Sequence, residues 1–406
     1  GIVENLTSGK SYCSIQSAIN DSLTQNGDVI NIDSALYNES VIVNKEITLL
    51  GNGGNPNSPP TVAGISGQTI SIRAPNVTIN NLIITFDQET VNTGILAAAS
   101  GSFNNLTVKN SCIFGTGTTA APVFESFGLQ LGTFGGVFYD QVNLDSNEIR
   151  HTGTSPLGRG VKTFNCYGDW KRSSITGFYS IQSGDIQGGL LNITNDSLRG
   201  ETEINSTGAG THSFSNNVCD VANAYGPGTD FALLELKNIS FGGTNLIISG
   251  NKFQNYVNFG IFSGRSDNVS IDNNTFSPDQ AGVYFRSIRI DSKQRTTASQ
   301  TAFVSGANIT NNKFNGNLAS GQAGVSIELA NSDNISSIGT VTLGSPGNEN
   351  NFSADVSKFI SLNNEADSTA SDPVWTGTYI SEKGKVTANV NGEFNNFDVG
   401  PGLQLP

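Results

Sequence analysis

Methionine is absent from all 406 residues, including position 1. Because a newly translated chain begins with Met, we expect a mature or excised fragment, with any signal peptide already removed. Long apolar runs are missing as well, and no segment approaches the roughly 20 residues that a membrane-spanning helix needs. The sequence therefore predicts no membrane span, and the lack of a leader gives no evidence for a cytoplasmic protein.

Basic residues are scarce. Lys and Arg together number 21, against 34 Asp and Glu, which gives a formal net charge of −13. A nucleic-acid-binding protein needs a basic face, so we exclude nucleic acid as a partner. The acidic balance fits a soluble extracellular protein, although acidity that only keeps the chain in solution is the simpler explanation.

Histidine and cysteine are also rare. The two histidines, His151 and His212, occur in unrelated contexts and give little support to acid–base catalysis by histidine. The spacing of the four cysteines matches no zinc pattern, and we expect buried free thiols or one disulfide. These cysteines are Cys13, Cys112, Cys166 and Cys219.

A short repeat is what the chain does contain. Residues 268–276 read Asn-Val-Ser-Ile-Asp-Asn-Asn-Thr-Phe, in which apolar and polar residues alternate as in a strand. Similar segments lie at 76–82, 105–112, 143–149, 245–253 and 308–314. A spacing often of roughly 20 to 30 residues predicts stacked coils, and short strands with Asn and Gly turns predict a parallel β-helix.

The asparagines of the repeat have a structural interpretation. We expect Val269 and Ile271 to face the core, and Asn273 and Asn274 to form a corner. In stacked coils, side-chain amides at one corner can form a hydrogen-bonded ladder. Asn-X-Ser/Thr triplets also occur, and in a chain so rich in these residues such triplets arise by chance. Examples begin at Asn5, Asn38, Asn76, Asn192, Asn268 and Asn351.

The first residues, 1–35, are predicted to cap the open end of the solenoid. Ser14 is suited to begin a short helix, in which Ile15, Ala18, Ile19 and Leu23 share one apolar face. Such a helix can cover the first coil and thereby shield its core from water.

No linker divides the chain, so we predict a single domain over 1–406. Residues 150–240 are the least regular and are predicted to carry insertions, as is the segment 287–304. Residues 356–406 are expected to hold the last coils and a tail, whose end is either a tether to further sequence or a cut point.

The opening of the chain resembles a known family. The segments 15–19, 27–30, 35–39 and 47–51 are similar to the start of pectin-methylesterase-like proteins, in the pectin lyase-like group of bacterial secreted and cell-surface β-helices. The resemblance implies a right-handed parallel β-helix. The later catalytic motifs of the esterases are not found, and Leu157-Gly-Arg159 resembles one of them without the Pro-Trp that should follow. We therefore transfer no catalytic role.

Two clusters of basic residues are candidates for a site on an acidic polysaccharide. β-Elimination needs a cation to neutralise a uronate carboxylate and a base near the α-proton. The candidate catalytic residues are Arg159, Lys162, Asp169 and Arg172. The candidate binding residues are Tyr167 and Trp170, whose rings can stack on a sugar, and Arg286 and Arg289. Solvated loops with balancing charges, and a Trp170 that packs the insertion, are the structural alternatives.

Other chemistries find less support. Glycoside hydrolysis needs a carboxylate pair, and the Gly-His-Gly and Asp-Asp motifs of the polygalacturonase-like enzymes are absent. Asp267, Asp272 and the neighbouring asparagines have oxygen ligands of the type that calcium prefers, but they form no known calcium-loop pattern. The sequence assigns no cofactor and no metal, and leaves calcium open.

Two functions remain, and the sequence leaves open whether the protein is an enzyme. The first is a secreted or surface-displayed adhesin or glycan- or partner-binding module, itself complete or part of a longer surface protein. The second is a lyase or glycoside hydrolase that acts on an acidic polysaccharide, an expectation that rests on analogy of fold. A phage-tailspike segment is a third possibility, which would require a trimer.

Overall fold

A computed structural model gives the fold of the protein. The residues that it describes are 1–98, 103–117, 123–132, 140–152, 157–164, 166–183, 190–205, 210–221, 232–237, 244–264, 266, 268–279, 286–291, 305–316, 323–329, 338–344, 347–348, 350–353, 358–364, 375–376 and 386–390.

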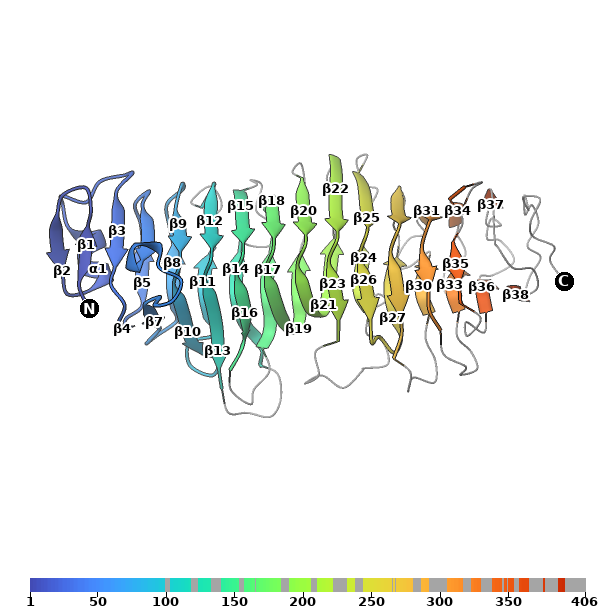
Figure 1. Ribbon diagram of the computed structural model, residues 1–406, viewed down its shortest axis with the longest axis horizontal. Coiled ribbons are helices and arrows are strands. Elements are labelled where there is room, and N and C mark those ends of the chain that lie inside the picture. Colours follow the sequence, from blue (N-terminus) through green and yellow to red (C-terminus); the bar gives the residue numbers. More distant parts are fainter. Residues whose placement is uncertain are drawn as a thin grey trace. The chain divides into compact units, whose positions relative to one another are not determined.

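The chain divides into two compact units, Gly1–Gly200 and Glu201–Pro406. Each unit is a parallel β-helix in which the strands form three stacks, and, apart from the first two strands of the chain, the paired strands of neighbouring coils run parallel (Figure 1). A coil passes in turn through three stacks, which we call the A stack, the first B stack and the second B stack. The strands of each stack are given below. The predicted all-β, right-handed parallel β-helix is thus confirmed.

The strands of the first unit are short near its start and lengthen toward its end. Its A stack contains β1 (Val3–Asn5), β3 (Val29–Ile32), β6 (Thr48–Gly51), β9 (Thr78–Asn80), β12 (Leu106–Lys109), β15 (Asp140–Asp145), β18 (Cys166–Lys171) and β20 (Leu191–Thr194). Its first B stack contains β4 (Leu36–Asn38), β7 (Thr61–Ala63), β10 (Ile83–Asp87), β13 (Cys112–Thr116), β16 (Glu148–His151) and the beginning of β19 (Ser174–Ser183). Its second B stack contains β5 (Val41–Val43), β8 (Gln68–Ile72), β11 (Thr93–Ala97), β14 (Val123–Leu131), β17 (Leu157–Thr163) and the end of β19.

The second unit repeats the three stacks. Its A stack contains β22 (Gly210–Ser215), β25 (Thr244–Ser249), β28 (Val269–Asp272), β31 (Ser305–Thr310), β34 (Ile338–Leu343) and β37 (Trp375–Thr376). Its first B stack contains β23 (Val218–Asp220), β26 (Lys252–Gln254), β29 (Thr275–Ser277), β32 (Lys313–Phe314) and β35 (Asn351–Phe352). Its second B stack contains β24 (Ala232–Lys237), β27 (Phe259–Gly264), β30 (Arg286–Asp291), β33 (Ala323–Leu329), β36 (Lys358–Asn364) and β38 (Val386–Val390). One strand, β21 (Ser197–Asn205), crosses the boundary between the units.

Alternation of side chains explains the core. In β28, Val269 and Ile271 are 1% and 0% exposed, as the repeat predicted. Register pairing stacks Ile271 directly on Ile248 and Ile309 of the neighbouring coils. Each such side chain contributes roughly 1.5–3 kcal/mol on burial, so the coils are held together by columns of aliphatic side chains.

The corners depend on asparagine and glycine. Asn268 and Asn273, which flank β28, have φ values of 50° and 54°, and Gly250 occupies the equivalent corner of the preceding coil at 68°. Residues with a Cβ atom rarely adopt this left-handed conformation, and Asn tolerates it best among them. This requirement explains why Asn ends so many of the repeats.

The predicted amide ladder is confirmed in the second unit. The backbone N–H of Asn251 donates to Oδ1 of Asn274 at 2.9 Å, and the N–H of Asn274 donates to Oδ1 of Asn312 at 2.9 Å. Asn217 and Asn350 extend the ladder at its two ends. A parallel column of phenylalanine rings lies beside it, with centroids 4.6–5.0 Å apart, formed by Phe253, Phe276, Phe314 and Phe352.

The predicted N-terminal cap contains one helix, α1 (Ile15–Asn20), and a turn of 3₁₀ helix, η1 (Asn52–Gly54), follows β6. Ser14 caps α1 by accepting the N–H of Ser17 at 3.1 Å, and Ile15, Ala18 and Ile19 are fully buried. The prediction for Leu23 is wrong, because the helix ends before it and its side chain is 57% exposed.

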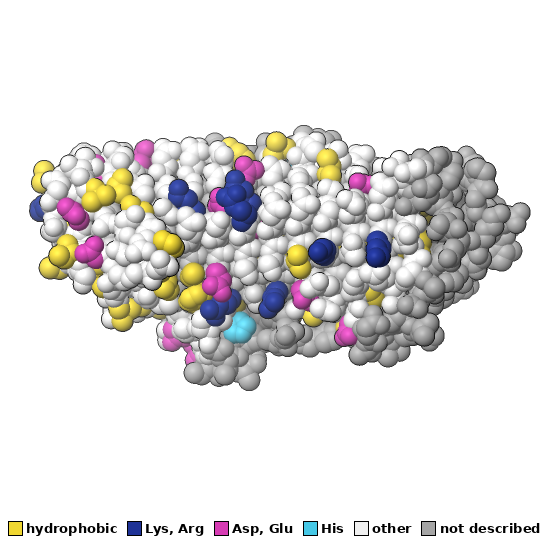
Figure 2. Space-filling model, viewed as in Figure 1, with side chains coloured by type: hydrophobic (Ala, Val, Ile, Leu, Met, Phe, Trp, Pro, Cys, Tyr) yellow, Lys and Arg dark blue, Asp and Glu magenta, His cyan; other side chains and the backbone are white. Residues whose placement is uncertain are grey.

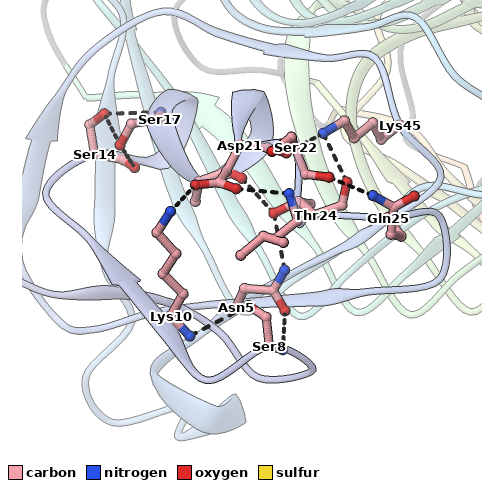
Figure 3. A network of polar contacts seen from close by, with 12 residues as sticks. Asn5, Ser8, Lys10, Ser14, Ser17, Asp21, Ser22, Thr24, Gln25 and Lys45 are labelled. Carbon is pink, nitrogen blue, oxygen red and sulfur yellow. Dashed lines mark hydrogen bonds and ion pairs between the residues drawn. The ribbon is translucent and has the colours of Figure 1, made fainter.

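Polar contacts fix the cap in place. Asn5 donates from Nδ2 to Thr24 Oγ1 at 3.0 Å (Figure 3), and also to Asp28 Oδ2 at 2.8 Å. Its strand β1 pairs antiparallel with both β2 (Lys10–Tyr12) and β3. The strand direction therefore reverses at this end of the stack.

All four cysteines are free, so the alternative of one disulfide is wrong, and the prediction of buried free thiols holds for two of the four. Cys166 and Cys219 are buried, Cys112 is half-buried and Cys13 is exposed. Burial raises the pKa of the Cys166 thiol to about 12, which keeps it protonated and unreactive. The division into a cap, insertions at 150–240 and a tail at 356–406 stays a prediction, and the end of the tail, beyond 390, lies outside the described residues.

Candidate functional site

The long strands of the second B stack present two outward positions, three residues apart. In the first unit, the half-buried Arg159 and Tyr179 occupy the first position in β17 and β19, and Phe127, which is only 5% exposed, occupies it in β14. Lys162 and Gln182 occupy the second position in β17 and β19. We call these five residues the cationic–aromatic row.

Glycine makes this arrangement possible. Gly160 lies between the two outward positions of β17, and a Cβ atom there would come within 2.4 Å of Ile175 Cγ2 and 2.6 Å of the Ser180 carbonyl oxygen. Because no side chain fits, the strand turns inward at this point and aims both Arg159 and Lys162 outward.

Arg159 is held between two aromatic rings. Its guanidinium carbon lies 5.4 Å from the Phe127 ring centroid and 5.7 Å from the Tyr179 ring centroid. The arginine Nε donates to Gln182 Oε1 at 2.6 Å. Its side chain is only 12% exposed, so the guanidinium is fixed in orientation and partly removed from water.

Lys162 donates a hydrogen bond to the same oxygen atom of Gln182. Its Nζ donates to Gln182 Oε1 at 2.9 Å and lies 5.0 Å from the Phe164 ring centroid. Two cationic groups therefore converge on one uncharged oxygen. Glu125 Oε1 lies 3.5 Å from Arg159 Nη1, but the Glu125 side chain is 77% exposed, where an ion pair contributes little.

The other two candidate catalytic residues lie elsewhere in the first unit. Asp169 belongs to β18 of the A stack, where its Oδ1 accepts from Asn192 Nδ2 at 2.8 Å. Arg172 follows the same strand and forms an ion pair with Asp145, with Nε 2.9 Å from Oδ1. The four candidates thus separate into a pair on the second B stack and two residues on the A stack, and only Arg159 and Lys162 are brought together.

The Arg172 ion pair has an electrostatic effect on its partner. Burial alone would raise the pKa of Asp145, but hydrogen bonds from Arg172 and Ser146 outweigh it and lower the pKa. On the face shown in Figure 2, several Lys and Arg side chains similarly lie beside Asp or Glu. Such pairs are typical of a balanced surface and do not by themselves indicate a site.

The two aromatic candidates differ in accessibility. Trp170 is fully buried inside the coil, and its Nε1 donates to the Val142 carbonyl oxygen at 3.1 Å. Its indole therefore packs the core and has no face exposed to a sugar. Tyr167 is half-buried in β18, beside Gln141 of the neighbouring strand. The structural interpretation of Trp170 explains its place, whereas Tyr167 stays a binding candidate.

Arg286 and Arg289 lie in the second unit, on β30. Residues three apart in a regular strand face opposite sides, but Ser287 and Ile288 are buried in succession, so the alternation is interrupted between the two arginines. Arg289 lies 5.7 and 5.3 Å from the ring centroids of Phe259 and Phe262, and it binds Asp291 at 2.6 Å. Arg289 is thus already paired with a carboxylate.

Sequence reasoning missed an ion-pair cluster in the second unit. Lys237 Nζ lies 3.0 Å from Glu203 Oε2 and 3.5 Å from Glu235 Oε2. Burial alone would lower the pKa of Lys237, but the charges of Glu203 and Glu235 outweigh it and raise the pKa. The lysine is therefore a fixed cation and not a candidate base.

The remaining polar groups of the described residues include two histidines and no cluster suited to a metal ion. Burial lowers the pKa of both histidines, His151 and His212, so both are neutral at physiological pH. Among the described residues, no group of three or more His, Cys, Asp or Glu side chains is arranged to hold a metal ion. Nor does that part of the chain contain a helix long and apolar enough to cross a membrane.

No family model matches the chain. A cell surface glycoprotein of Methanothermus fervidus is 37% identical over 84 residues, which are 20% of this chain and 13% of that protein. The match therefore spans about an eighth of the length of that relative.

Solved structures with parallel β-helices are also similar. The A-module of mannuronan C-5 epimerase AlgE6 from Azotobacter vinelandii has a TM-score of 0.45 and 12% identity, and covers 91% of this chain and 94% of its own. Tailspike protein 3 of bacteriophage CBA120 has a TM-score of 0.39 and 14% identity, and covers 89% of this chain and 54% of its own.

Proposed function

We propose that the protein is a secreted or surface-displayed β-helix module that binds a negatively charged glycan in adhesion. The observation that carries this proposal is the cationic–aromatic row. Arg159 and Lys162 converge on Gln182, beside the rings of Phe127 and Tyr179, on the outward side of one stack. In a chain with a net charge of −13, a cationic pair at one point favours an anionic ligand.

The chemistry of the row suits a sugar acid. A guanidinium and an ammonium that lie 2.6 and 2.9 Å from one amide oxygen present two cations at one point, where a carboxylate or sulfate group would bind both more strongly than the amide does. The half-buried Tyr179 offers its ring to the C–H face of a pyranose. The row thus combines charge recognition with a stacking surface.

Display at the cell surface has separate support. The relative of Methanothermus fervidus is named a cell surface glycoprotein, and its matching segment is 37% identical. The acidic composition fits an extracellular protein as well. Membership in a longer surface protein is part of the same proposal.

The test is equilibrium binding of the folded chain to a panel of uronate and sulfated polysaccharides, with neutral glycans for comparison. We expect binding only to the anionic members, and a loss of at least about tenfold in R159Q/K162Q, since two charge-assisted contacts are removed. R172Q is the matched control, because it also removes a positive charge but lies on the A stack. Equal binding by R159Q/K162Q and the unchanged chain would contradict the proposal.

A polysaccharide lyase is the second candidate, and one observation favours it. Arg159 and Lys162 are close enough to share an acceptor, so one can neutralise a uronate carboxylate while the other approaches the α-proton. Incubation with the same panel, followed by absorbance of the unsaturated product, tests this activity. Cleavage that disappears in K162Q would favour the lyase over a module that only binds.

A further inference from the structure

The coil that contains β28 has an Asn-X-Ser/Thr triplet on each side of the strand. Asn268-Val-Ser270 begins at the corner before β28, and Asn273-Asn-Thr275 begins at the corner after it. Both leading asparagines are exposed and left-handed, with φ values of 50° and 54°. The backbone therefore presents their amides on protruding corners.

The middle residue of each triplet is buried. Val269 faces the core at 1% exposure, and Asn274 belongs to the amide ladder at 1% exposure. Ser270 and Thr275, the third residues of the two triplets, are half-buried, so their side chains are partly accessible. In the described part of the chain, neither the two amides nor the two hydroxyls take part in a side-chain hydrogen bond.

The triplet at Asn5 is the opposite case. Asn5 is 0% exposed, and both hydrogens of its Nδ2 are engaged, by Thr24 at 3.0 Å (Figure 3) and by Asp28 at 2.8 Å. Its Oδ1 accepts the backbone N–H of Thr7 at 2.9 Å. An enzyme cannot reach this amide without unfolding the cap.

In other triplets, either the asparagine amide or the Ser/Thr hydroxyl already takes part in a hydrogen bond. Asn76 donates to Glu46 at 2.9 Å, and Asn105 donates to Asn76 at 2.9 Å. Asn192 donates to Asp169 at 2.8 Å. In the triplet that starts at Asn308, the hydroxyl of Thr310 donates to Asp272 Oδ1 at 2.7 Å.

We propose that Asn268 and Asn273 are acceptor sites for N-linked glycans. In the reaction, Nδ2 forms a bond to the anomeric carbon of a lipid-linked glycosyl pyrophosphate, the bond from that carbon to the phosphate oxygen breaks, and the amide loses one proton. The triplet at Asn20 has an aspartate in the middle position, whose charge repels this anionic donor. The chemistry requires an outward amide with a nearby hydroxyl, which both corners of the β28 coil provide.

This inference rests on the surface-display part of the proposed function, because the glycan is attached outside the cytoplasm. It does not depend on the cationic–aromatic row, which lies in the first unit. Glycan binding and glycan attachment can therefore fail independently, and each is measured on its own.

The experiment is glycopeptide mass spectrometry of the full chain recovered from the surface of the cells that produce it. We expect a glycan mass on the peptides that contain Asn268 and Asn273, and none on the peptide that contains Asn5. The same readout is applied to purified, folded chain incubated with an oligosaccharyltransferase that recognises Asn-X-Ser/Thr and a lipid-pyrophosphate oligosaccharide.

Variants separate the two sites. S270A should remove the glycan at Asn268 alone, and T275A the glycan at Asn273 alone, while T7A leaves the glycan mass unchanged. Unmodified peptides at both corners, or equal occupancy at Asn5, would overturn the inference. If R159Q/K162Q loses binding of the anionic glycan but keeps the glycans at Asn268 and Asn273, then glycan binding and glycan attachment are independent, as expected.

Discussion

The two units build the same corner from different residues. In the second unit, every position of the ladder is asparagine, from Asn217 to Asn350. In the first unit, the equivalent hydrogen bonds pass through Ser111, Asn147, Ser173 and Asp196. A column of buried phenylalanines stands beside the ladder in the second unit only, among the described residues.

The difference shows what each ladder residue must do. Asn both accepts a backbone N–H and donates to a carbonyl, as Asn274 does to Ile248 at 3.0 Å. Asp196 accepts the N–H of Ser173 at 2.6 Å, but an ionised carboxylate has no hydrogen to donate. The first unit therefore contains a ladder position whose hydrogen bonding depends on protonation.

The largest effect is expected from F276A. Removing a fully buried ring from the middle of the phenylalanine column leaves a cavity, and large-to-small changes of this kind cost about 3–5 kcal/mol. Chemical denaturation with hydrogen–deuterium exchange should show lower stability in the peptides of the second unit. Exchange that rises equally in the peptides of residues 1–98 would contradict a local effect.

N274A should follow, with a loss of about 2–4 kcal/mol. The change leaves the N–H of Asn251 and the carbonyl oxygen of Ile248 buried without their partner. S270A, on the outer side of the same coil, is the matched control and should stay within about 0.5 kcal/mol. Denaturation midpoints that do not differ between the two variants would mean that the ladder adds little.

D196N should raise stability at neutral and alkaline pH. Burial raises the pKa of Asp196 to about 7 from its ordinary 3.8, so the folded state keeps the proton over a range where the unfolded chain has lost it. The stability of the unchanged chain should therefore fall as the pH rises from about 4 to about 7, and the variant should lack this slope. We expect a gain of about 2 kcal/mol at pH 8. Urea denaturation across this pH range measures it, and parallel profiles would refute the assignment.

R172Q is expected to have the smallest effect, at most about 0.5 kcal/mol. Its ion pair with Asp145 has side chains that are 58% and 25% exposed, and exposed pairs contribute little. The same denaturation measurement applies. A loss above about 1 kcal/mol would show that the A stack of the first unit depends on its surface charges more than the geometry suggests.

The repeat predicted the fold because its signal is local. The alternation at Val269 and Ile271 identifies the strand of one coil, and the corner asparagines identify its turns. Leu23 was placed wrongly because the apolar spacing continued past the end of the helix, and spacing alone does not show where a helix stops.

The cationic–aromatic row could be predicted only in part. Arg159 and Lys162 were singled out by their charge, but Phe127, Tyr179 and Gln182 were not. These residues meet through the register of β14, β17 and β19, which depends on coil lengths that the sequence does not reveal. For Trp170 the sequence left a sugar-binding role and a packing role open, since aromatic residues serve both cores and sugar sites, and its burial favours the packing role.

The antiparallel strands at the N-terminal cap have a consequence for self-association. A parallel stack that ended in a bare strand would offer its open edge to another molecule and could grow as a fibre. Here the last strand, β2, has only three residues, pairs antiparallel with the reversed strand β1, and carries the exposed Lys10. A fibre that extends this sheet would have to pair with a short, charged edge, so the cap keeps neighbouring molecules apart as well as covering the core.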